Sequence, residues 1–207
     1  GGENEILLAA QRYDRVFSSN GQTISSLPRP SRLHQEDFAQ AMGIPASEKY
    51  EREPSGYMKS MFEILRKYSA DPITDQLKLW DIIVFNYLIG NTDAHIKNFS
   101  LLYGENLSKI RLAPAYDIIS TVIYEQSSRD MAFSIGGVFS LDELTRDSFR
   151  MAAHDVGLGE IMALRRFDEM ADRFKTALHS ASEQLEKQGY SKAEKIKKRI
   201  LVGKYTD

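Results

Sequence analysis

One stretch, Gly90-Asn91-Thr92-Asp93-Ala94-His95-Ile96-Lys97-Asn98-Phe99-Ser100, decides how this chain is interpreted. An apolar run, Ile82 to Ile89, leads directly into it. Beyond a predicted hairpin follows a second distinctive stretch, Leu112-Ala113-Pro114-Ala115-Tyr116-Asp117-Ile118-Ile119-Ser120. Asn, Asp, His and Lys are costly to bury without partners but are good ligands for metal ions and phosphates. Their position after a buried segment therefore indicates a functional loop.

The order of the polar residues is typical of a kinase-type phosphoryl-transfer site. Such a site needs a carboxylate near the attacking hydroxyl and oxygen ligands for Mg²⁺. Asp93 suits the first task, whereas the Asn98 amide oxygen and the Asp117 carboxylate suit the second. Lys97 is placed to screen the charge of a moving phosphate. Asp93 and Asn98 are also five residues apart, which is the interval in the kinase catalytic loop.

Composition places the chain among ordinary globular proteins. Its 207 residues are 42% hydrophobic and 27% charged, enough for one substantial core. The net charge of −2 gives no global reason to expect nucleic acid or an anionic membrane as a partner. Without cysteine, disulfides, thiolate catalysis and Cys-based zinc sites are excluded, which suits a cytoplasmic location. No apolar run approaches about 18 residues, so no membrane span is expected.

The hydrophobic pattern predicts a mainly α-helical fold around one small β element. Extended segments are expected at Glu5 to Ala10, at Met131 to Val138, and in a hairpin that pairs Phe99–Tyr103 with Ile110–Ala113. Ser31 is expected to cap the first helix, which ends at Gly43. The other expected helices cover 56–68, 72–90, a region from Ser140 or Thr145 to near Gly157, 161–189 and 192–200.

Five stretches together resemble a known family. They are Ala10-Gln11-Arg12-Tyr13-Asp14-Arg15, Arg32-Leu33-His34-Gln35-Glu36-Asp37-Phe38, Asn91 to Ser100, Leu112 to Ser120, and Met131-Ala132-Phe133-Ser134-Ile135-Gly136-Gly137. In combination they resemble the HipA family of bacterial serine/threonine kinases, the toxins of HipA–HipB toxin–antitoxin pairs. The resemblance spans roughly residues 6–161 and implies a protein-kinase-like C-terminal lobe, a helical bundle whose small hairpin carries the catalytic and metal-binding segments.

The resemblance also implies roles for single residues. Asp93 would be the catalytic acid/base, assisted by Lys97, while Asn98 and Asp117 would hold Mg²⁺. ATP would be the second cofactor, with its phosphates along His95 to Asn98. The residues implied at the nucleotide are Gln11, Arg12, Tyr13, His95, Lys97, Asn98 and Asp117. Family members commonly carry Glu at the position of Gln11, which affects only the expected adenine contact.

The expected organisation is a single C-terminal lobe over residues 1–207. It comprises a hinge and entry strand (1–17), a flexible loop (18–31), a catalytic core (32–160) and C-terminal helices (161–207). The N-terminal lobe that grips ATP is expected to be absent, because Gly136-Gly137 follows the catalytic residues and cannot serve as its phosphate loop. We therefore expect a fragment or half of a split kinase, weak or inactive without that lobe in cis or in trans.

Partners and alternative functions follow from the same resemblance. It implies a protein hydroxyl as acceptor, with an aminoacyl-tRNA synthetase as substrate, and a HipB-like helix-turn-helix antitoxin that alone would contact DNA. The alternatives are a non-catalytic module that docks an antitoxin or a separate N-lobe, and a small-molecule kinase. A hydrolase metal site at Asp93 and His95 is disfavoured because the other histidines are scattered. The basic cluster Lys195 to Arg199 is interpreted as a solvated helix end, with a DNA or antitoxin contact as the alternative.

Overall fold

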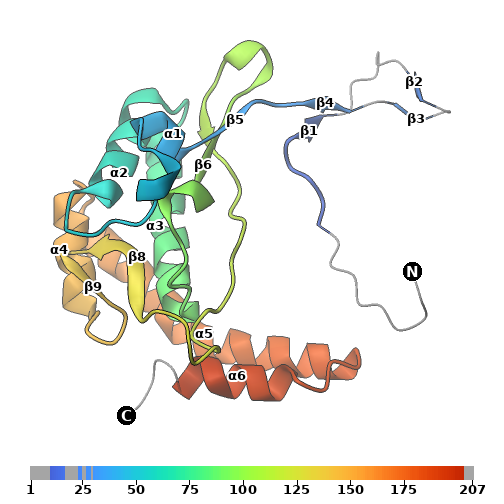
Figure 1. Cartoon of the computed structure of the whole chain (residues 1–207), viewed down its shortest axis with the longest axis vertical. Helices are drawn as coiled ribbons and strands as arrows, with labels where there is room; N and C mark the ends of the chain where they lie inside the picture. Colours follow the sequence, from blue (N-terminus) through green and yellow to red (C-terminus); the bar gives the residue numbers. More distant parts are fainter. Residues whose placement is uncertain (1–9, 17–22, 25–26, 29, 203–207) are drawn as a thin grey trace.

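The computed structural model describes residues 10–16, 23–24, 27–28 and 30–202. In its helical body α2 and α5 contact α3, and α6 contacts α5, while small antiparallel sheets lie beside the helices (Figure 1). The helices are α1 (Phe38–Met42), α2 (Tyr57–Tyr68), α3 (Pro72–Ile89), α4 (Arg146–Asp155), α5 (Glu160–Lys187) and α6 (Ala193–Val202). The strands are β1 (Arg15–Val16), β2 (Thr23–Ile24), β3 (Leu27–Pro28), β4 (Ser31–Arg32), β5 (Gln35–Asp37), β6 (Ser100–Leu102), β7 (Arg111–Leu112), β8 (Asp130–Ile135) and β9 (Val138–Ser140). The fold is thus mainly helical with small antiparallel sheets.

Helix α3 is the predicted central helix. Asp71 caps its start by accepting a hydrogen bond from the Thr74 backbone N–H, and Pro72 occupies the first turn. Trp80, fully buried at mid-helix, donates its indole N–H to the Ala163 carbonyl of α5 at 3.0 Å. The helix ends at Gly90, whose φ of 69° is the left-handed conformation that suits glycine. Helix α3 is therefore fixed at its start, middle and end, and it delivers the polar loop at a defined point.

The predicted hairpin is confirmed, and the structure adds a third strand to it. Strand β6 pairs with β7 (Leu101 opposite Leu112) and, on its other side, with β5 (Asp37 opposite Ser100). The loop with Asp93 directly precedes β6, and the segment with Asp117 follows β7. The hairpin therefore carries both polar segments, as expected. Strand β5 was not predicted, because its sequence Gln-Glu-Asp has no strand-type apolar alternation.

The predicted helix start at Ser31 is wrong. Ser31 lies in β4, where it pairs with Val16 of β1. Helix α1 begins only at Phe38, because Asp37 and Gln40 form a reciprocal capping box at that point. Its predicted end at Gly43 is confirmed.

Two predicted segments at the start of the chain, the first strand and the loop over residues 18–31, are only partly described by the structure. Within the range 18–31, expected to be a loop, residues 23–24 pair with residues 27–28. Residues 5–9 of the expected first strand lie outside the described part of the chain. In Figure 1 the pairs β1–β4 and β2–β3 form an extended arm beside the helical body.

The C-terminal half follows the predicted helices with one addition. The extended segment after Asp117 is a hairpin, β8–β9, turned by Gly136 and Gly137, both with positive φ. A Cβ on Gly136 would lie 2.2 Å from the Ser148 carbonyl oxygen, so this turn packs directly on α4. Of the two predicted starts for the next helix, Thr145 is the cap of α4.

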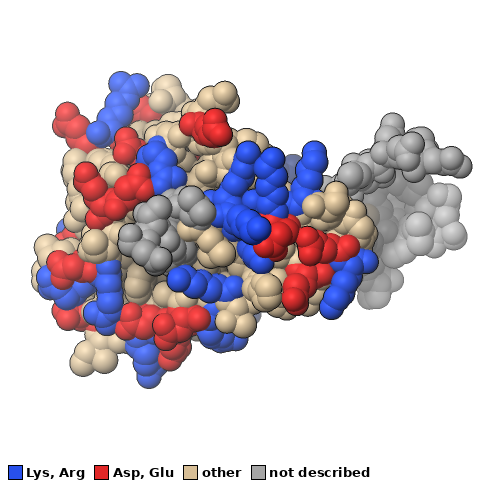
Figure 2. Space-filling view, turned by 90° about the horizontal axis from the view of Figure 1, so that it is seen from below, with Lys and Arg blue, Asp and Glu red and all other residues tan. Residues whose placement is uncertain are grey.

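The basic cluster on α6 is largely paired. Lys197 forms an ion pair with Glu194 at 2.6 Å, Lys198 contacts the same carboxylate at 3.8 Å, and Arg199 donates to the Ile123 carbonyl. Figure 2, which views the molecule from the end where α5 and α6 lie, shows basic and acidic side chains interspersed. These contacts support the interpretation as a solvated helix end. Within the described ranges, no helix is long and apolar enough to cross a membrane.

Candidate active site

Asn91 links the two polar segments at the end of α3. Its buried side chain donates from Nδ2 to Asn86 Oδ1 at 2.8 Å and to the Asp117 carbonyl at 3.2 Å. Its Oδ1 accepts the Asp93 backbone N–H at 3.2 Å. One buried amide thus holds the backbones of Asp93 and Asp117 in a fixed relation, because breaking either bond would leave a buried polar group unpaired.

Gly90 and Thr121 strengthen the same junction. The Gly90 carbonyl accepts hydrogen bonds from the backbone N–H and the hydroxyl of Thr121, and Thr121 Oγ1 in turn accepts the Thr92 N–H at 2.8 Å. A Cβ on Gly90 would lie 2.5 Å from a methyl group of Val122. The segment after Asp117 therefore packs against Gly90 so closely that only glycine fits there.

Asp93 is half-buried and presents its carboxylate to a cleft of about 680 Å³. The Tyr50 hydroxyl donates a hydrogen bond to Asp93 Oδ1. Burial, and then the neighbouring Asp93 carboxylate, raise the pKa of Tyr50 to about 12, so its phenol stays protonated at ordinary pH. Asn98 Nδ2 donates to the Asp93 carbonyl at 3.0 Å and closes the loop between the two residues.

His95 lies within this loop, buried, with its Nε2 2.9 Å from the Lys49 ammonium. Burial, and then Lys49, lower the pKa of His95 against the opposing effect of Asp93. Because an ammonium only donates, Nε2 must accept, which assigns the proton of the neutral ring to Nδ1. Among the described residues, Nδ1 has no hydrogen-bond partner. A phosphate oxygen would satisfy this donor, but it can reach the buried Nδ1 only if the local structure moves.

Lys97 forms an ion pair with a neighbouring strand. Its ammonium lies 2.8 Å from Asp37 Oδ2, at the junction of β5 and α1. Its carbonyl accepts the Tyr116 hydroxyl at 2.8 Å, which adds a further tie to the Asp117 segment. The Asp37 carboxylate thus holds the Lys97 ammonium beside the loop. A phosphate that binds Lys97 would have to displace Asp37 or bind the ammonium together with it.

Asn98 and Asp117 offer the oxygen atoms expected of magnesium ligands. The Asn98 amide nitrogen is occupied by the Asp93 carbonyl, which leaves Oδ1 as the ligand atom. Asp117 is exposed and has a φ of 54°, a left-handed conformation that costs most residues about 1–3 kcal/mol. Within the described chain, no three His, Cys, Asp or Glu side chains gather as a metal group. The set fits Mg²⁺, which typically takes one or two carboxylates and completes its shell with water and phosphate.

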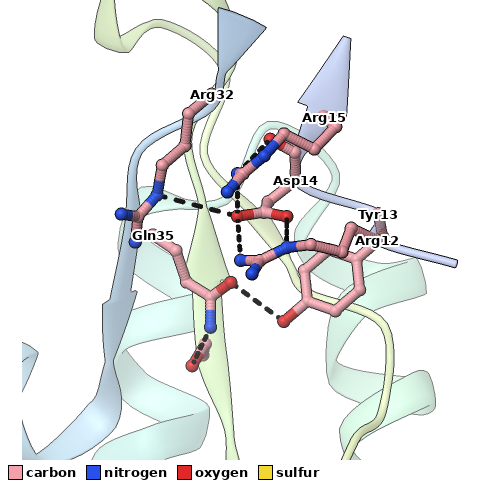
Figure 3. A network of polar contacts seen from close by, with 7 residues as sticks. Arg12, Tyr13, Asp14, Arg15, Arg32 and Gln35 are labelled. Carbon is pink, nitrogen blue, oxygen red and sulfur yellow. Dashed lines mark hydrogen bonds and ion pairs between the residues drawn. The ribbon is translucent and has the colours of Figure 1, made fainter. Parts of the chain in front are cut away.

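The segment from Gln11 to Asp14, which directly precedes β1 and is called the hinge-type segment below, is built around a buried carboxylate. Asp14 accepts hydrogen bonds from Arg12 (2.8 and 2.7 Å) and Arg15, and lies 3.7 Å from Arg32 (Figure 3). The hydrogen bond from Arg12, above all, lowers the pKa of Asp14 to about 2. The Arg12 guanidinium is therefore engaged with Asp14, whereas the side chain of Gln11 is exposed.

Tyr13 connects the hinge-type segment to the sheet and to the Asp117 segment. Its hydroxyl donates to Gln35 Oε1 at 2.9 Å, and Gln35 Nε2 donates to Ser100 Oγ at 3.0 Å (Figure 3). Its ring stacks on Tyr116 with the centroids 6.4 Å apart. The structure thus places Tyr13 in contact with the rest of the site, whereas the side chain of Gln11 is exposed.

Several residues of the site had been given no role by sequence reasoning, among them Lys49, Tyr50 and Asn91. Lys49 and Tyr50 lie in a polar segment that ends at a proline, and nothing in its pattern marks them as neighbours of a loop 43 residues further on. Asn91 stood within the quoted motif, and its place directly after the helix-ending Gly90 was the available signal.

Comparison with known proteins identifies the family. The profile of the HipA-like C-terminal domain matches residues 2–193, nearly the whole chain. The chain belongs to the HipA-like C-terminal domain family. A solved structure of HipA with HipB and operator DNA from Shewanella oneidensis superposes with a TM-score of 0.75, at 23% identity, over 93% of this chain and 46% of that one. That match shows a shared fold.

Curated relatives of this HipA-like domain carry kinase names. A Sinorhizobium fredii protein named "Putative kinase Y4mE" is 42% identical over 80% of the chain. The "Serine/threonine-protein kinase toxin HipA" of Shewanella oneidensis is 28% identical over 73% of the chain. The chain spans 37% and 35% of these relatives.

Proposed function

We propose that this domain is the catalytic lobe of an ATP- and Mg²⁺-dependent serine/threonine protein kinase of the HipA type. The observation that carries the proposal is the Asn91 side chain. It fixes the backbones of Asp93 and Asp117 through hydrogen bonds of 3.2 Å each, while Asn98 is bonded to Asp93. A phosphoryl-transfer site consists mainly of such positioning, because the reaction itself needs little covalent chemistry from the protein.

Each residue has a distinct task in this proposal. Asp93 orients the acceptor hydroxyl and accepts its proton. Asn98 Oδ1 and the Asp117 carboxylate hold Mg²⁺, which neutralises phosphate charge when bound. His95 donates its Nδ1–H to a phosphate oxygen. Lys49 donates to Nε2 and so fixes the tautomer that carries the proton on Nδ1. Lys97, at present paired with Asp37, contributes positive charge beside the phosphates.

The remaining parts of the proposal concern the rest of the gene product and its partners. An N-terminal lobe, in cis or in trans, would complete the nucleotide site above Tyr13, and without it the chain would be weak or inactive. The HipA in the matched structure is bound to HipB and operator DNA, which supports a HipB-like antitoxin as a partner. A cytoplasmic location and a protein substrate, with an aminoacyl-tRNA synthetase as the first candidate, belong to the same proposal.

The test is ATP-dependent phosphorylation by the gene product that carries this chain. We expect transfer of the γ-phosphate to protein, at a rate that Asp93→Asn lowers about 10²–10⁴-fold. Asp172→Asn, the same change at an exposed position of α5, serves as the matched control and retains activity. Equal activity of the Asp93→Asn variant would refute the role of Asp93. If the unaltered protein transfers no phosphate but binds an antitoxin or a separate N-lobe, the domain is a binding module instead.

A further inference from the structure

Tyr50 stands where an acceptor would have to enter. The cleft of about 680 Å³ beside Asp93 is lined among others by Tyr50, Arg52, Asp93, Asp130, Met131 and Phe139. Tyr50 is 42% exposed and is one of the residues that line the cleft. A hydroxyl that approaches Asp93 Oδ1 through this cleft approaches the atom to which the Tyr50 hydroxyl is hydrogen-bonded.

The Tyr50 hydroxyl already makes the contact that an acceptor hydroxyl requires. A general base must lie within hydrogen-bond reach of the proton that it removes. The Tyr50 phenol donates its proton to Asp93 Oδ1, and because its pKa is raised to about 12 it stays a neutral donor there. The carboxylate oxygen is thus occupied by a hydroxyl of the protein itself.

The backbone next to Tyr50 is anchored, whereas its side chain is partly exposed. The next residue, Glu51, is buried, and its backbone N–H donates to the Ala132 carbonyl at 2.9 Å. The Tyr50 ring meets His95 edge-on at 5.3 Å, and the Lys49 ammonium lies 4.9 Å from the ring centroid. Because the backbone is anchored, the hydroxyl can be separated from Asp93 only by a rotation of the side chain, for which the adjoining cleft provides space.

We propose that the Tyr50 hydroxyl is an internal stand-in for the acceptor hydroxyl, which it keeps away from Asp93 until an acceptor displaces it. This inference rests on the proposed kinase function. In the reaction, the acceptor hydroxyl replaces the phenol, its oxygen bonds to the γ-phosphorus of ATP, the bridging bond to ADP breaks, and the proton passes to Asp93. Tyr50 is neither phosphorylated nor consumed.

The test uses water as the acceptor, so that the protein substrate need not be known. We compare basal ATP hydrolysis by the full gene product with that of its Tyr50→Phe variant, which keeps the ring contacts to His95 and Lys49. We expect hydrolysis to rise about tenfold, equivalent to about 1.4 kcal/mol, because water no longer competes with the phenol for Asp93. With casein as a protein acceptor, KM for casein should fall while KM for ATP is unchanged.

Tyr103→Phe is the matched control. Tyr103 also donates its hydroxyl to a carboxylate, Glu36, and its pKa is likewise raised to about 12, but it does not line the cleft. This variant should hydrolyse ATP at the wild-type rate.

Three results would overturn one proposal or the other. Turnover that depends on Asp93 but is unchanged or lowered by Tyr50→Phe overturns the stand-in role and leaves the kinase intact. Phosphate found on Tyr50 overturns it as well, because the residue would then be a substrate. Absence of Asp93-dependent turnover in both the wild type and Tyr50→Phe overturns the kinase function itself.

Discussion

Two groups of carboxylates in this domain differ in how fully they are hydrogen-bonded. Asp75, fully buried in α3, accepts hydrogen bonds from Ser69, from the Leu112 backbone and from two nitrogens of Arg111. Glu51, also buried, accepts from Ser55, Tyr57 and Ser134. By contrast, the Asp93 carboxylate accepts from Tyr50, and that of Asp117 from no donor among the described residues.

The difference separates structural acids from candidate catalytic ones. Burial raises the pKa of Asp75 and Glu51, but the hydrogen bonds they accept outweigh burial, and both pKa values are lowered overall. Such a carboxylate stabilises the fold and has no capacity left for a ligand. Asp117 and Asp93 Oδ2 keep lone pairs for a cation or a proton, and among the described residues Asp93 Oδ1 accepts only the Tyr50 hydroxyl. Both backbones are held by Asn91. In this domain, position is fixed through the backbone and chemistry is left to the side chain.

The largest effect is expected at Asp93, whose carboxylate lines the cleft. Asp93→Asn should lower the rate of phosphate transfer by about 10²–10⁴-fold, the usual contribution of a general base. Its midpoint of thermal unfolding should stay at the wild-type value, because the Asn91 and Asn98 bonds use only backbone atoms of Asp93. A large loss of thermal stability would place Asp93 among the structural acids.

The same Asp-to-Asn change at the fully hydrogen-bonded Asp75 should affect stability instead of catalysis. Asp75→Asn is expected to lower the free energy of unfolding by about 1–3 kcal/mol, the usual cost of leaving buried hydrogen-bonding groups unsatisfied. The new amide NH₂ would also face the donors of Arg111 or Leu112. Urea denaturation monitored by circular dichroism measures this change. A loss below about 1 kcal/mol would contradict the assigned role of Asp75.

Asn91→Ala should affect both stability and activity. We expect a loss of about 1–3 kcal/mol in the free energy of unfolding, because Asn86 Oδ1 and the Asp117 carbonyl lose their donor. Transfer activity should also fall about 100-fold, the cost of a misplacement of about 1 Å at a catalytic group. Measured under conditions where the variant is folded, normal activity would show that the Asn91 link is not needed for positioning.

The smallest effect is a pH dependence that originates from Glu51. Because the pKa of Glu51 is lowered in the folded state, its stabilising contribution is present above the unfolded value of 4.5 and is lost as the pH falls below it. The difference in unfolding free energy between wild type and Glu51→Gln should therefore shrink as the pH falls from 6 to 3. A difference that stays constant over this range would contradict the lowered pKa.

Local signals in the sequence predicted most of the helical fold. Pro72 and Gly90 mark the two ends of α3, and the apolar residues between them identified it as the central helix. The hairpin that flanks the two polar segments was predicted from turn residues between short apolar runs. Strand β5 and the late start of α1 were missed, because Gln35 to Asp37 forms a strand only through pairing with β6, far along the chain.

The sequence motif identified the candidate site residues, but it did not predict which other residues they contact. Asp93, Asn98 and Asp117 follow from residue type and spacing, whereas the partners of Lys97 and Arg12 do not. Tyr50 reaches Asp93 across 43 positions, and no periodicity in the sequence encodes such a contact. The roles of the site residues themselves stay predictions for the kinetic experiments above.

Gly90 has a consequence for how the family should be read in alignments. It contacts no expected ligand, yet a methyl group at its Cα would lie 2.5 Å from Val122 and force the Asp117 segment away from the loop. Selection for function should therefore keep Gly90 as strictly as Asp93, although its side-chain position contributes only the absence of a methyl group. A ranking of active-site residues by invariance alone would count this glycine among the chemical groups, and only the packing tells the two kinds of constraint apart.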